Sequence, residues 1–409
     1  MFFDSWERNF RACPSPFAGR KFIVAQCALT LNALEDIIVK TERWEEVAVS
    51  GLDVKQFWAE NERCFGRFDV HKPRVPISFW LDDHFLLEAM RLPSTLRYYR
   101  DEQYRLSVHR AYNQITRRIL GRTFYDEDPA PQPVRFEVLM GAKWEMREGG
   151  TPWLESEVKD ERDLKRVVER MERMEVEREM FAGEWPARVE AYLETHDALP
   201  PMGGGSRAPV TMATSILGTE NFCYFLYDEP ELMTRFFEAL SKNLVRYQLA
   251  LRKLTGNGRS GYSFTDDNCY LMTPELYRKF AMPAMERILS ALAPGKDDVR
   301  HQHSDSDMGH LMPLLNELGI NAVNLGPNID PRDIRRAMPE AVIEGQIPPF
   351  LLRNGTKEEI FEAVRQDIEK VGADGGLVEC TAGSVTGGTP LENILAYMEA
   401  VDRYGRIYD

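Results

Sequence analysis

The C-terminal half of the chain carries three side chains whose types and spacing suit a metal ion. His301 and His303 are two residues apart, so both imidazoles point to the same side if this segment is an extended strand. Cys380 closes a short apolar run at residues 376–380. Two imidazoles and a thiolate offer two nitrogens and one sulfur, a set that suits Zn²⁺ and leaves its fourth coordination position open. The sequence therefore predicts a catalytic zinc ion bound by His301, His303 and Cys380.

Three carboxylates are candidates for acid–base chemistry beside such a metal. Asp82, Glu220 and Asp266 each stand at the end of a predicted strand. A carboxylate in that place can act as a general acid or base, or as a fourth metal ligand. The same residue types also cap helices and bind backbone N–H groups, so a structural role is the alternative for each of them. We predict all three as catalytic residues because strand ends are where sites of this kind form.

An alternation of apolar and helical segments indicates which elements hold these residues. Six apolar runs are each followed by a helical segment, and they lie at residues 209–217, 262–264, 299–303, 322–325, 341–345 and 376–380. Six strand–helix units in a row imply a parallel sheet. Residues 75–80 and one further strand at 120–150 bring the count to eight, which predicts an α/β fold, a (β/α)8 TIM barrel. A doubly wound open sheet is the alternative, because alternation alone does not show closure.

The remaining segments divide the chain into two predicted parts. Residues 1–70 are expected to form an N-terminal helical extension. Residues 71–409 are expected to form the catalytic barrel, with a helical and hairpin elaboration at about residues 85–200. Within that elaboration, the pattern predicts a hairpin at residues 134–148 and a long surface helix at 155–195.

Charge and composition narrow the class of protein. The chain has 409 residues and a formal net charge of −14, which argues against a nucleic-acid partner because phosphate backbones are bound by Lys and Arg. No window approaches 18 uncharged apolar residues and the first residues lack a signal-peptide pattern, so neither a membrane span nor export is expected. Six cysteines without disulfide-type spacing fit a reducing cytoplasm. The oligomeric state stays open.

Several short stretches of the chain together resemble the uroporphyrinogen decarboxylase superfamily, and most closely its corrinoid-dependent methyltransferase branch. The matching stretches lie at residues 217–222, 228–231, 266–268, 272–277, 301–305, 354–356 and 387–393. The similarity extends over roughly residues 205–405 and is looser before them. It implies a (β/α)8 barrel.

The resemblance also implies a metal pattern from which this chain departs at one position. In the zinc methyltransferases of the family the ligands form a His-x-Cys pair followed much later by a second Cys. His301 matches the first ligand and Cys380 the last, but His303 stands where those enzymes carry a cysteine. A neutral imidazole in place of a thiolate leaves zinc more electrophilic, which favours polarising a methyl–oxygen bond over activating a thiolate.

The resemblance therefore implies a methyltransferase that moves a methyl group from a methoxylated substrate, such as an aryl methyl ether, to the cobalt of cob(I)alamin. The sequence lacks the Asp-x-His-x-x-Gly corrinoid signature, so the cobamide is expected on a separate corrinoid protein. The aromatic residues Trp80, Tyr262, Phe264 and Phe350 stand near strand ends and are candidates to line a pocket for the aryl group, with core packing as the equal alternative for each. The residues that contact the corrinoid are not predicted.

Four alternatives remain at this point. A methylcobamide:thiol methyltransferase, of the kind that methylates coenzyme M, is the nearest one. A decarboxylase is a weaker match, because residues 17–21 only partly resemble its Arg-rich segment and it needs no metal. Thiol-adding epoxide enzymes of the same superfamily also use zinc. The fourth alternative is an accessory protein that binds metal or corrinoid without turnover.

Overall fold

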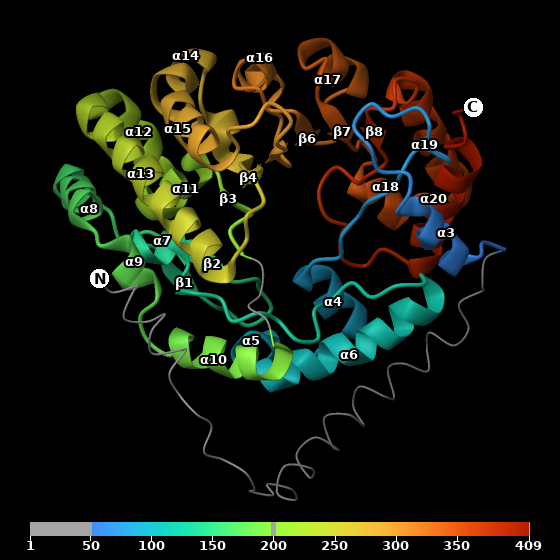
Figure 1. Ribbon diagram of the computed structural model, residues 1–409, viewed down its shortest axis with the longest axis horizontal. Coiled ribbons are helices and arrows are strands. Elements are labelled where there is room, and N and C mark those ends of the chain that lie inside the picture. Colours follow the sequence, from blue (N-terminus) through green and yellow to red (C-terminus); the bar gives the residue numbers. More distant parts are fainter. Residues whose placement is uncertain (1–50, 198–201, 409) are drawn as a thin grey trace, which may run out of the picture. The chain divides into compact units, whose positions relative to one another are not determined.

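Six short parallel strands follow one another across a single sheet in the order of the sequence (Figure 1). They are β3 (Gly205–Arg207), β4 (Tyr262–Thr265), β5 (Arg300–His303), β6 (Ala322–Asn324), β7 (Val342–Glu344) and β8 (Leu377–Val378). The computed structural model describes residues 51–197 and 202–408. The parallel register places Thr265 beside His303 and His303 beside Asn324, so the carboxyl ends of neighbouring strands meet at one edge.

The segment at residues 75–81 lies beside the chain that follows β8. Ile77 pairs with Glu379 in parallel, and backbone hydrogen bonds of 2.8 Å run from Ser78 N–H to Glu379 O and from Glu379 N–H to Pro76 O. The strand order thus runs in one direction until the last strand meets the first segment, whereas a doubly wound sheet reverses its order at a switch point. The fold is therefore a (β/α)8 barrel, as predicted.

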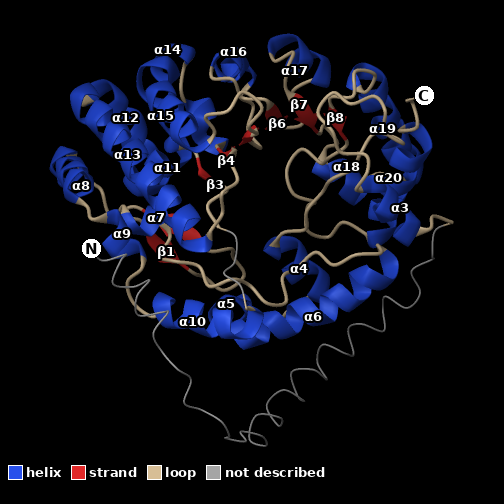
Figure 2. Ribbon diagram, viewed as in Figure 1, coloured by secondary structure: helices blue, strands red, loops and turns tan. Residues whose placement is uncertain are grey.

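Helices line the outer side of the strands in the C-terminal half, and the described chain holds further helices away from the sheet (Figure 2). Before β3 they are α3 (Val54–Asn61), α4 (Asp83–Met90), α5 (Thr95–Arg100), α6 (Glu102–Ile119), α7 (Phe136–Leu139), α8 (Glu161–Arg173), α9 (Val176–Met180) and α10 (Trp185–His196). After β3 they are α11 (Pro209–Leu217), α12 (Thr219–Asp228), α13 (Pro230–Thr255), η2 (Asp267–Leu271), α14 (Pro274–Leu276), η3 (Tyr277–Ala281), α15 (Met282–Leu292), η4 (Gly309–Leu311), α16 (Met312–Glu317), α17 (Pro331–Ala337), α18 (Pro349–Asn354), α19 (Lys357–Val371) and α20 (Leu391–Tyr404). Among these helices, none combines the length and the apolar character that crossing a bilayer requires.

Local side-chain chemistry sets several of the helix starts. Thr273 accepts a hydrogen bond from Leu276 N–H, and Asp330 accepts one from Arg332 N–H, each just before a proline at the first helical position. Thr356 and Glu359 form a reciprocal capping box at the start of α19. Each cap fixes the residue at which its helix begins and therefore where the preceding loop ends.

The structure corrects the element predictions for residues 209–217 and 155–195. Residues 209–217 form helix α11 and not a strand, and the strand lies just before them in β3. All nine residues of α11 are buried, including the polar Thr211, Thr214 and Ser215, so the helix has no charged or solvent-exposed face that would separate it from a buried strand. Residues 155–195 form three helices, because the chain turns to an extended backbone at Met174.

The region that was expected to supply a further barrel strand contains a separate hairpin. Strands β1 (Lys143–Glu145) and β2 (Trp153–Glu155) pair with each other in antiparallel fashion, outside the six-stranded sheet. Helix α7 occupies part of the first predicted hairpin strand. Within the described residues, no strand fills the second place of the barrel, between residues 75–81 and β3. Of the predicted N-terminal extension, residues 1–50 lie outside the described chain, and α3 is a helix within the remainder.

A buried carboxylate anchors the loop after β7 and makes stability depend on pH. Asp367 of α19 is 6% exposed and accepts a 2.9 Å hydrogen bond from Gln346 N–H. Burial raises the pKa of Asp367 above its ordinary value, against the lowering effects of Gln346 N–H and Lys370. The native state therefore binds more protons than the unfolded state above the ordinary Asp pKa, and the free energy of unfolding falls as pH rises through that window.

Asp367→Asn is expected to remove this contribution, because an amide oxygen still accepts the hydrogen bond but does not titrate. Urea unfolding measured at several values from about pH 4 to about pH 7 should show a shallower fall for the variant than for the wild type. Equal slopes for the two proteins would mean that Asp367 titrates normally in the fold.

Candidate metal centre and active site

The two histidines of β5 lie on the same side of the strand, as their spacing predicts. The side chains of His301 and His303 are 17% and 14% exposed, while Gln302 between them is fully buried on the other side. Both rings therefore lie on one side of the sheet at its carboxyl end. Each ring contacts a side chain of a neighbouring strand, Ser263 of β4 or Asn324 of β6.

Asn324 determines which nitrogen of His303 is available to a ligand. Its amide nitrogen donates to Glu344 O at 2.5 Å and to Thr381 O at 2.9 Å, and its Oδ1 accepts from Gly383 N–H at 3.2 Å. These contacts identify Oδ1 as the acceptor that faces Nδ1 of His303 at 2.7 Å. Nδ1 must then carry the proton, so Nε2 of the neutral ring presents a lone pair, the usual state of a metal-binding imidazole.

His301 has a similar arrangement on the other flank of the strand. Its Nδ1 lies 2.7 Å from Ser263 Oγ on β4, and its Nε2 lies 3.5 Å from Glu344 Oε2. Nε2 is buried and has no hydrogen-bond partner in the described structure. A buried nitrogen without a hydrogen-bond partner lowers the stability of the fold. A metal ion bound to this nitrogen would remove that cost.

Cys380 follows β8 and is fully buried. Burial raises the pKa of the Cys380 thiol well above its ordinary value, and the negative charges of Glu344 and Glu379 raise it further. Glu344 thus acts on both Cys380 and His301, which places these two predicted ligands around the same carboxylate. A cation in this position would offset the cost of forming a thiolate there.

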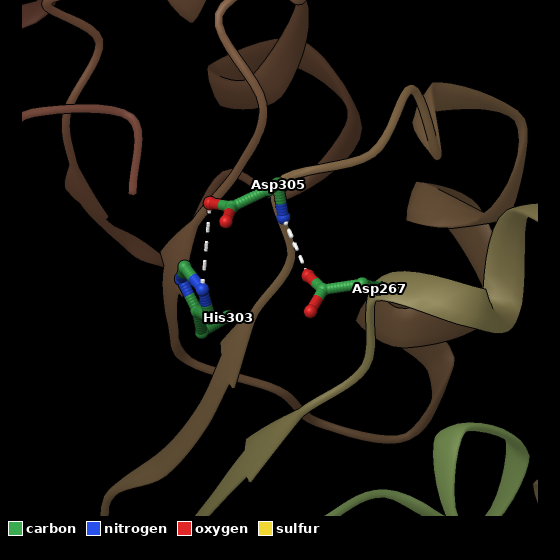
Figure 3. Close-up of side chains that lie close together, drawn as sticks. All are labelled: Asp267, His303 and Asp305. Carbon is green, nitrogen blue, oxygen red and sulfur yellow. Dashed lines mark hydrogen bonds and ion pairs between the residues drawn. The ribbon is translucent and has the colours of Figure 1, made fainter. Parts of the chain in front are cut away.

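A second group of potential ligands gathers around His303 (Figure 3). Ligand atoms of Asp267, His303 and Asp305 all lie within 4.8 Å of one another. His303 Nε2 is 3.5 Å from Asp305 Oδ1, and Asp305 N–H donates to Asp267 Oδ1 at 2.8 Å. Partial burial raises the pKa of Asp305, His303 lowers it, and the carboxylates of Asp267 and Asp82 raise it.

The backbone leaves room for this carboxylate only because residue 383 is a glycine. Gly383 has φ +101°, and a Cβ atom there would lie 2.3 Å from Asp305 Oδ1. Both the backbone conformation and the close approach therefore require glycine.

The structure brings the predicted metal ligands to one end of the barrel but does not draw their donor atoms into one cluster. Across the described residues, the group whose donor atoms all lie within 4.8 Å contains His303 without His301 or Cys380. The carboxylates of this group, Asp267 and Asp305, were not predicted as ligands. Their positions in the sequence could have indicated them, since Asp267 follows β4 and Asp305 stands two residues after His303.

The three predicted catalytic carboxylates lie in different surroundings. Asp82 caps α4 by accepting from Phe85 N–H at 2.8 Å, and its other oxygen accepts from Ser384 Oγ at 2.9 Å. It follows Trp80, whose ring packs edge-on against the His303 ring with centroids 5.6 Å apart. Asp82 therefore belongs to the same barrel mouth as His303.

Asp266 is buried beneath the mouth. Its Oδ1 accepts from both N–H and Oγ1 of Thr211, at 3.0 and 2.8 Å, while Oδ2 has no partner in the described chain. Burial raises the pKa of Asp266 to about 7. Glu220 is exposed in the first turn of α12, following α11 and not a strand. Of the three, Asp82 is the carboxylate that the structure places beside the candidate ligands.

The predicted aromatic pocket is only partly present. Tyr262 and Phe264 are buried at 2% and 0% exposure, so they belong to the core. Phe350 is exposed at 65%, and Trp80, at 37%, lies against His303. Trp80 alone of the four contacts a candidate ligand among the ring contacts of the described residues.

Comparison with known proteins relates this site to one family. The model of the uroporphyrinogen decarboxylase (URO-D) family matches residues 136–404. A methylated-thiol–coenzyme M methyltransferase from Methanosarcina mazei is 26% identical over 231 residues, 54% of this chain and 59% of that protein. A uroporphyrinogen decarboxylase from Chlorobaculum tepidum is 24% identical over 188 residues, 44% of this chain and 52% of that enzyme. The chain thus spans between half and three fifths of the length of these two relatives.

A solved structure shows the same fold over a longer range. A methyltransferase from Methanosarcina mazei superposes with a TM-score of 0.59 at 15% identity, covering 86% of this chain and 98% of the other. The resemblance inferred from the sequence motifs is confirmed, since the family model and a methyltransferase both match by sequence, and the solved structure shows the same fold. Because the family model covers well over half of the chain, this protein belongs to the uroporphyrinogen decarboxylase family.

Proposed function

We propose that this protein is a zinc-dependent methyltransferase that moves the methyl group of a methoxylated substrate, such as an aryl methyl ether, to the cobalt of a corrinoid. The observation that carries this proposal is the state of the two β5 histidines. Nδ1 of His303 is held as a donor by Asn324, and Nε2 of His301 is buried without a partner. The Nε2 atom of His303 is thereby available as an electron-pair donor at the barrel mouth, and that of His301 is available in the tautomer in which Nδ1 donates its proton to Ser263 Oγ.

The proposed zinc ligands are His301, His303 and Cys380. Nitrogen and sulfur donors suit zinc, and the unpartnered His301 Nε2 beside Glu344 fits a cation. The bound zinc would supply a Lewis acid that draws electron density from the ether oxygen as the methyl–oxygen bond breaks. Asp82 is the proposed general acid for that oxygen, since it lies at the same mouth, while Asp266 and Glu220 have more distant or more enclosed positions.

The corrinoid is proposed to arrive on a separate protein at the carboxyl ends of the strands. This rests on the family resemblance and on the absence of a corrinoid signature in the sequence. A decarboxylase role is less well supported, because that reaction uses no metal and leaves the arrangement of His301, His303 and Cys380 without a purpose.

One relative supports a second candidate function. The Methanosarcina mazei protein is named as a methylated-thiol–coenzyme M methyltransferase, so methyl transfer to or from a thiol is the alternative. The two functions differ in what zinc must do. An electron-rich zinc with two thiolates activates a thiolate, whereas His303 in place of a cysteine favours polarising an ether oxygen.

An assay with cob(I)alamin separates these functions. The zinc-loaded protein is incubated with methoxyarenes, simple methyl donors or methylated thiols, and methylcobalamin is followed by absorbance. We expect formation with methyl ethers and none with methylated thiols. His303→Cys is the matched variant, and it should lose activity toward ethers and gain activity toward thiols. Product from thiols alone would favour the second function, and no product from any donor would contradict both.

A further inference from the structure

A cavity of about 730 Å³ opens beside Asp82, away from the β5 histidines. Its walls come from α4, from α5 and α6, and from the β1 hairpin strand. The lining includes Asp83, Tyr99, Arg105, Arg135 and Trp144. These elements belong to the elaboration between the first barrel segment and β3. The cavity therefore adjoins the candidate active site through Asp82 but is built by a different part of the chain.

The acidic groups of this cavity are already engaged within the protein. Asp82 accepts from Phe85 N–H and Ser384 Oγ. Asp83 Oδ1 accepts from the buried Tyr98 hydroxyl at 2.8 Å. Both side chains thus already accept hydrogen bonds from fixed donors, which reduces what they offer to a ligand.

The two histidines of the cavity wall also contact other groups of the protein. His109 uses both ring nitrogens, since Nδ1 donates to Asp126 O at 2.6 Å and Nε2 lies 2.8 Å from Tyr98 Oη. His84 faces Glu88 at 3.5 Å. His109 therefore has no ring nitrogen left for a ligand, whereas His84 is a half-exposed side chain at the rim.

The basic groups of the cavity are less fully engaged. Within the described part of the chain, no carboxylate forms an ion pair with Arg135. The guanidinium of Arg135 lies 4.9 Å from the centre of the Trp144 ring. Arg105 lies 3.5 Å from Glu102, a carboxylate that also accepts a 2.9 Å hydrogen bond from Arg188. Two guanidinium groups thus face the cavity with spare hydrogen-bonding capacity, which suits a carboxylate.

Aromatic groups provide the rest of the recognition surface. Trp144 stands under Arg135, and Tyr99 has a buried hydroxyl with no hydrogen-bond partner in the described structure. A flat ring would contact these side chains, and a polar ring substituent would satisfy the Tyr99 hydroxyl.

We infer that this cavity binds the methyl donor as an aromatic carboxylate, with Arg105 and Arg135 receiving the carboxylate and Trp144 and Tyr99 contacting the ring. The inference rests on the proposed function for the identity of the ligand as methyl donor. The ether end of the bound ring then faces Asp82, the residue shared by the cavity and the barrel mouth.

Binding is tested without metal or corrinoid, so that the pocket and the chemistry can fail separately. Calorimetric titration of the metal-free protein with 4-methoxybenzoate should give saturable one-to-one binding. Neutral methoxybenzene should bind at least about tenfold more weakly, because it lacks the charge-assisted hydrogen bonds. Arg135→Gln and Arg105→Gln should each weaken binding of the benzoate by about tenfold, with methoxybenzene unaffected.

Arg178→Gln is the matched control, since Arg178 is an exposed arginine of α9 that pairs with Glu175; it should bind like the wild type. The inference is overturned if methoxybenzoate does not bind, if the neutral ring or 4-methoxybenzylamine binds as tightly, or if both arginine variants retain full affinity. Binding without methyl transfer would leave the pocket standing and remove the proposed chemistry. Methyl transfer from neutral ethers without this binding would do the reverse.

Discussion

Cys380→Ala is expected to cost the protein its stoichiometric zinc and to lower methyl transfer from an ether by at least about 100-fold. Loss of one of three protein ligands leaves the ion with too few donors, and a Lewis acid accounts for several kcal/mol of the barrier. The thiol is fully buried and feels the charge of Glu344, which also lies 3.5 Å from His301 Nε2, so Cys380 and His301 would hold the ion near the same carboxylate. Metal analysis of protein purified without chelator measures the first effect, and the cob(I)alamin assay measures the second.

Two further variants make this result specific. Cys223 lies in α12 and is not a predicted ligand, so Cys223→Ala should retain zinc and activity. Asp305→Asn tests the second group of donors, around His303. Zinc that survives in Cys380→Ala but is lost in Asp305→Asn would show that Asp267, His303 and Asp305 hold the metal instead. Thermal unfolding of each variant shows whether a lost metal reflects a lost fold.

Asn324→Leu is expected to lower the free energy of unfolding by about 4 kcal/mol. The Asn324 side chain is 1% exposed and makes four hydrogen bonds, to Glu344 O, Thr381 O, Gly383 N–H and His303 Nδ1. Leucine has a similar size but satisfies none of these groups, and each lost buried hydrogen bond costs roughly 1 kcal/mol. Urea unfolding of the metal-free protein measures the change without a contribution from bound zinc.

The same substitution should also weaken zinc binding, because His303 loses the acceptor that fixes its proton on Nδ1. Asn316→Leu is the matched control, since Asn316 is exposed in α16 and the change should stay within about 0.5 kcal/mol. If Asn324→Leu unfolds at the same urea concentration as this control, the amide does not tie the strand ends together as described.

Local patterns in the sequence correctly predicted many of the helices and strands in the C-terminal half. The predicted helices at residues 331–337 and 357–371 coincide with α17 and α19, because caps and prolines mark their starts. The prediction of a strand at 209–217 was wrong because α11 is buried on all sides and has no charged face, and only Thr211, Thr214 and Ser215 follow the helical spacing.

The candidate site also depends partly on local sequence and partly on the tertiary structure. The sequence alone determined the donor atoms that this protein can offer, since His301, His303 and Cys380 are recognisable from residue type, period and place after apolar runs. Only the tertiary structure decided which groups meet them. Asn324 lies beside His303 through the register of β5 and β6, and Asp305 turns back toward His303 where Gly383 leaves space. Such contacts depend on strand register and on the path of loops that join residues tens of positions apart. The local pattern of apolar and polar residues predicts neither of them.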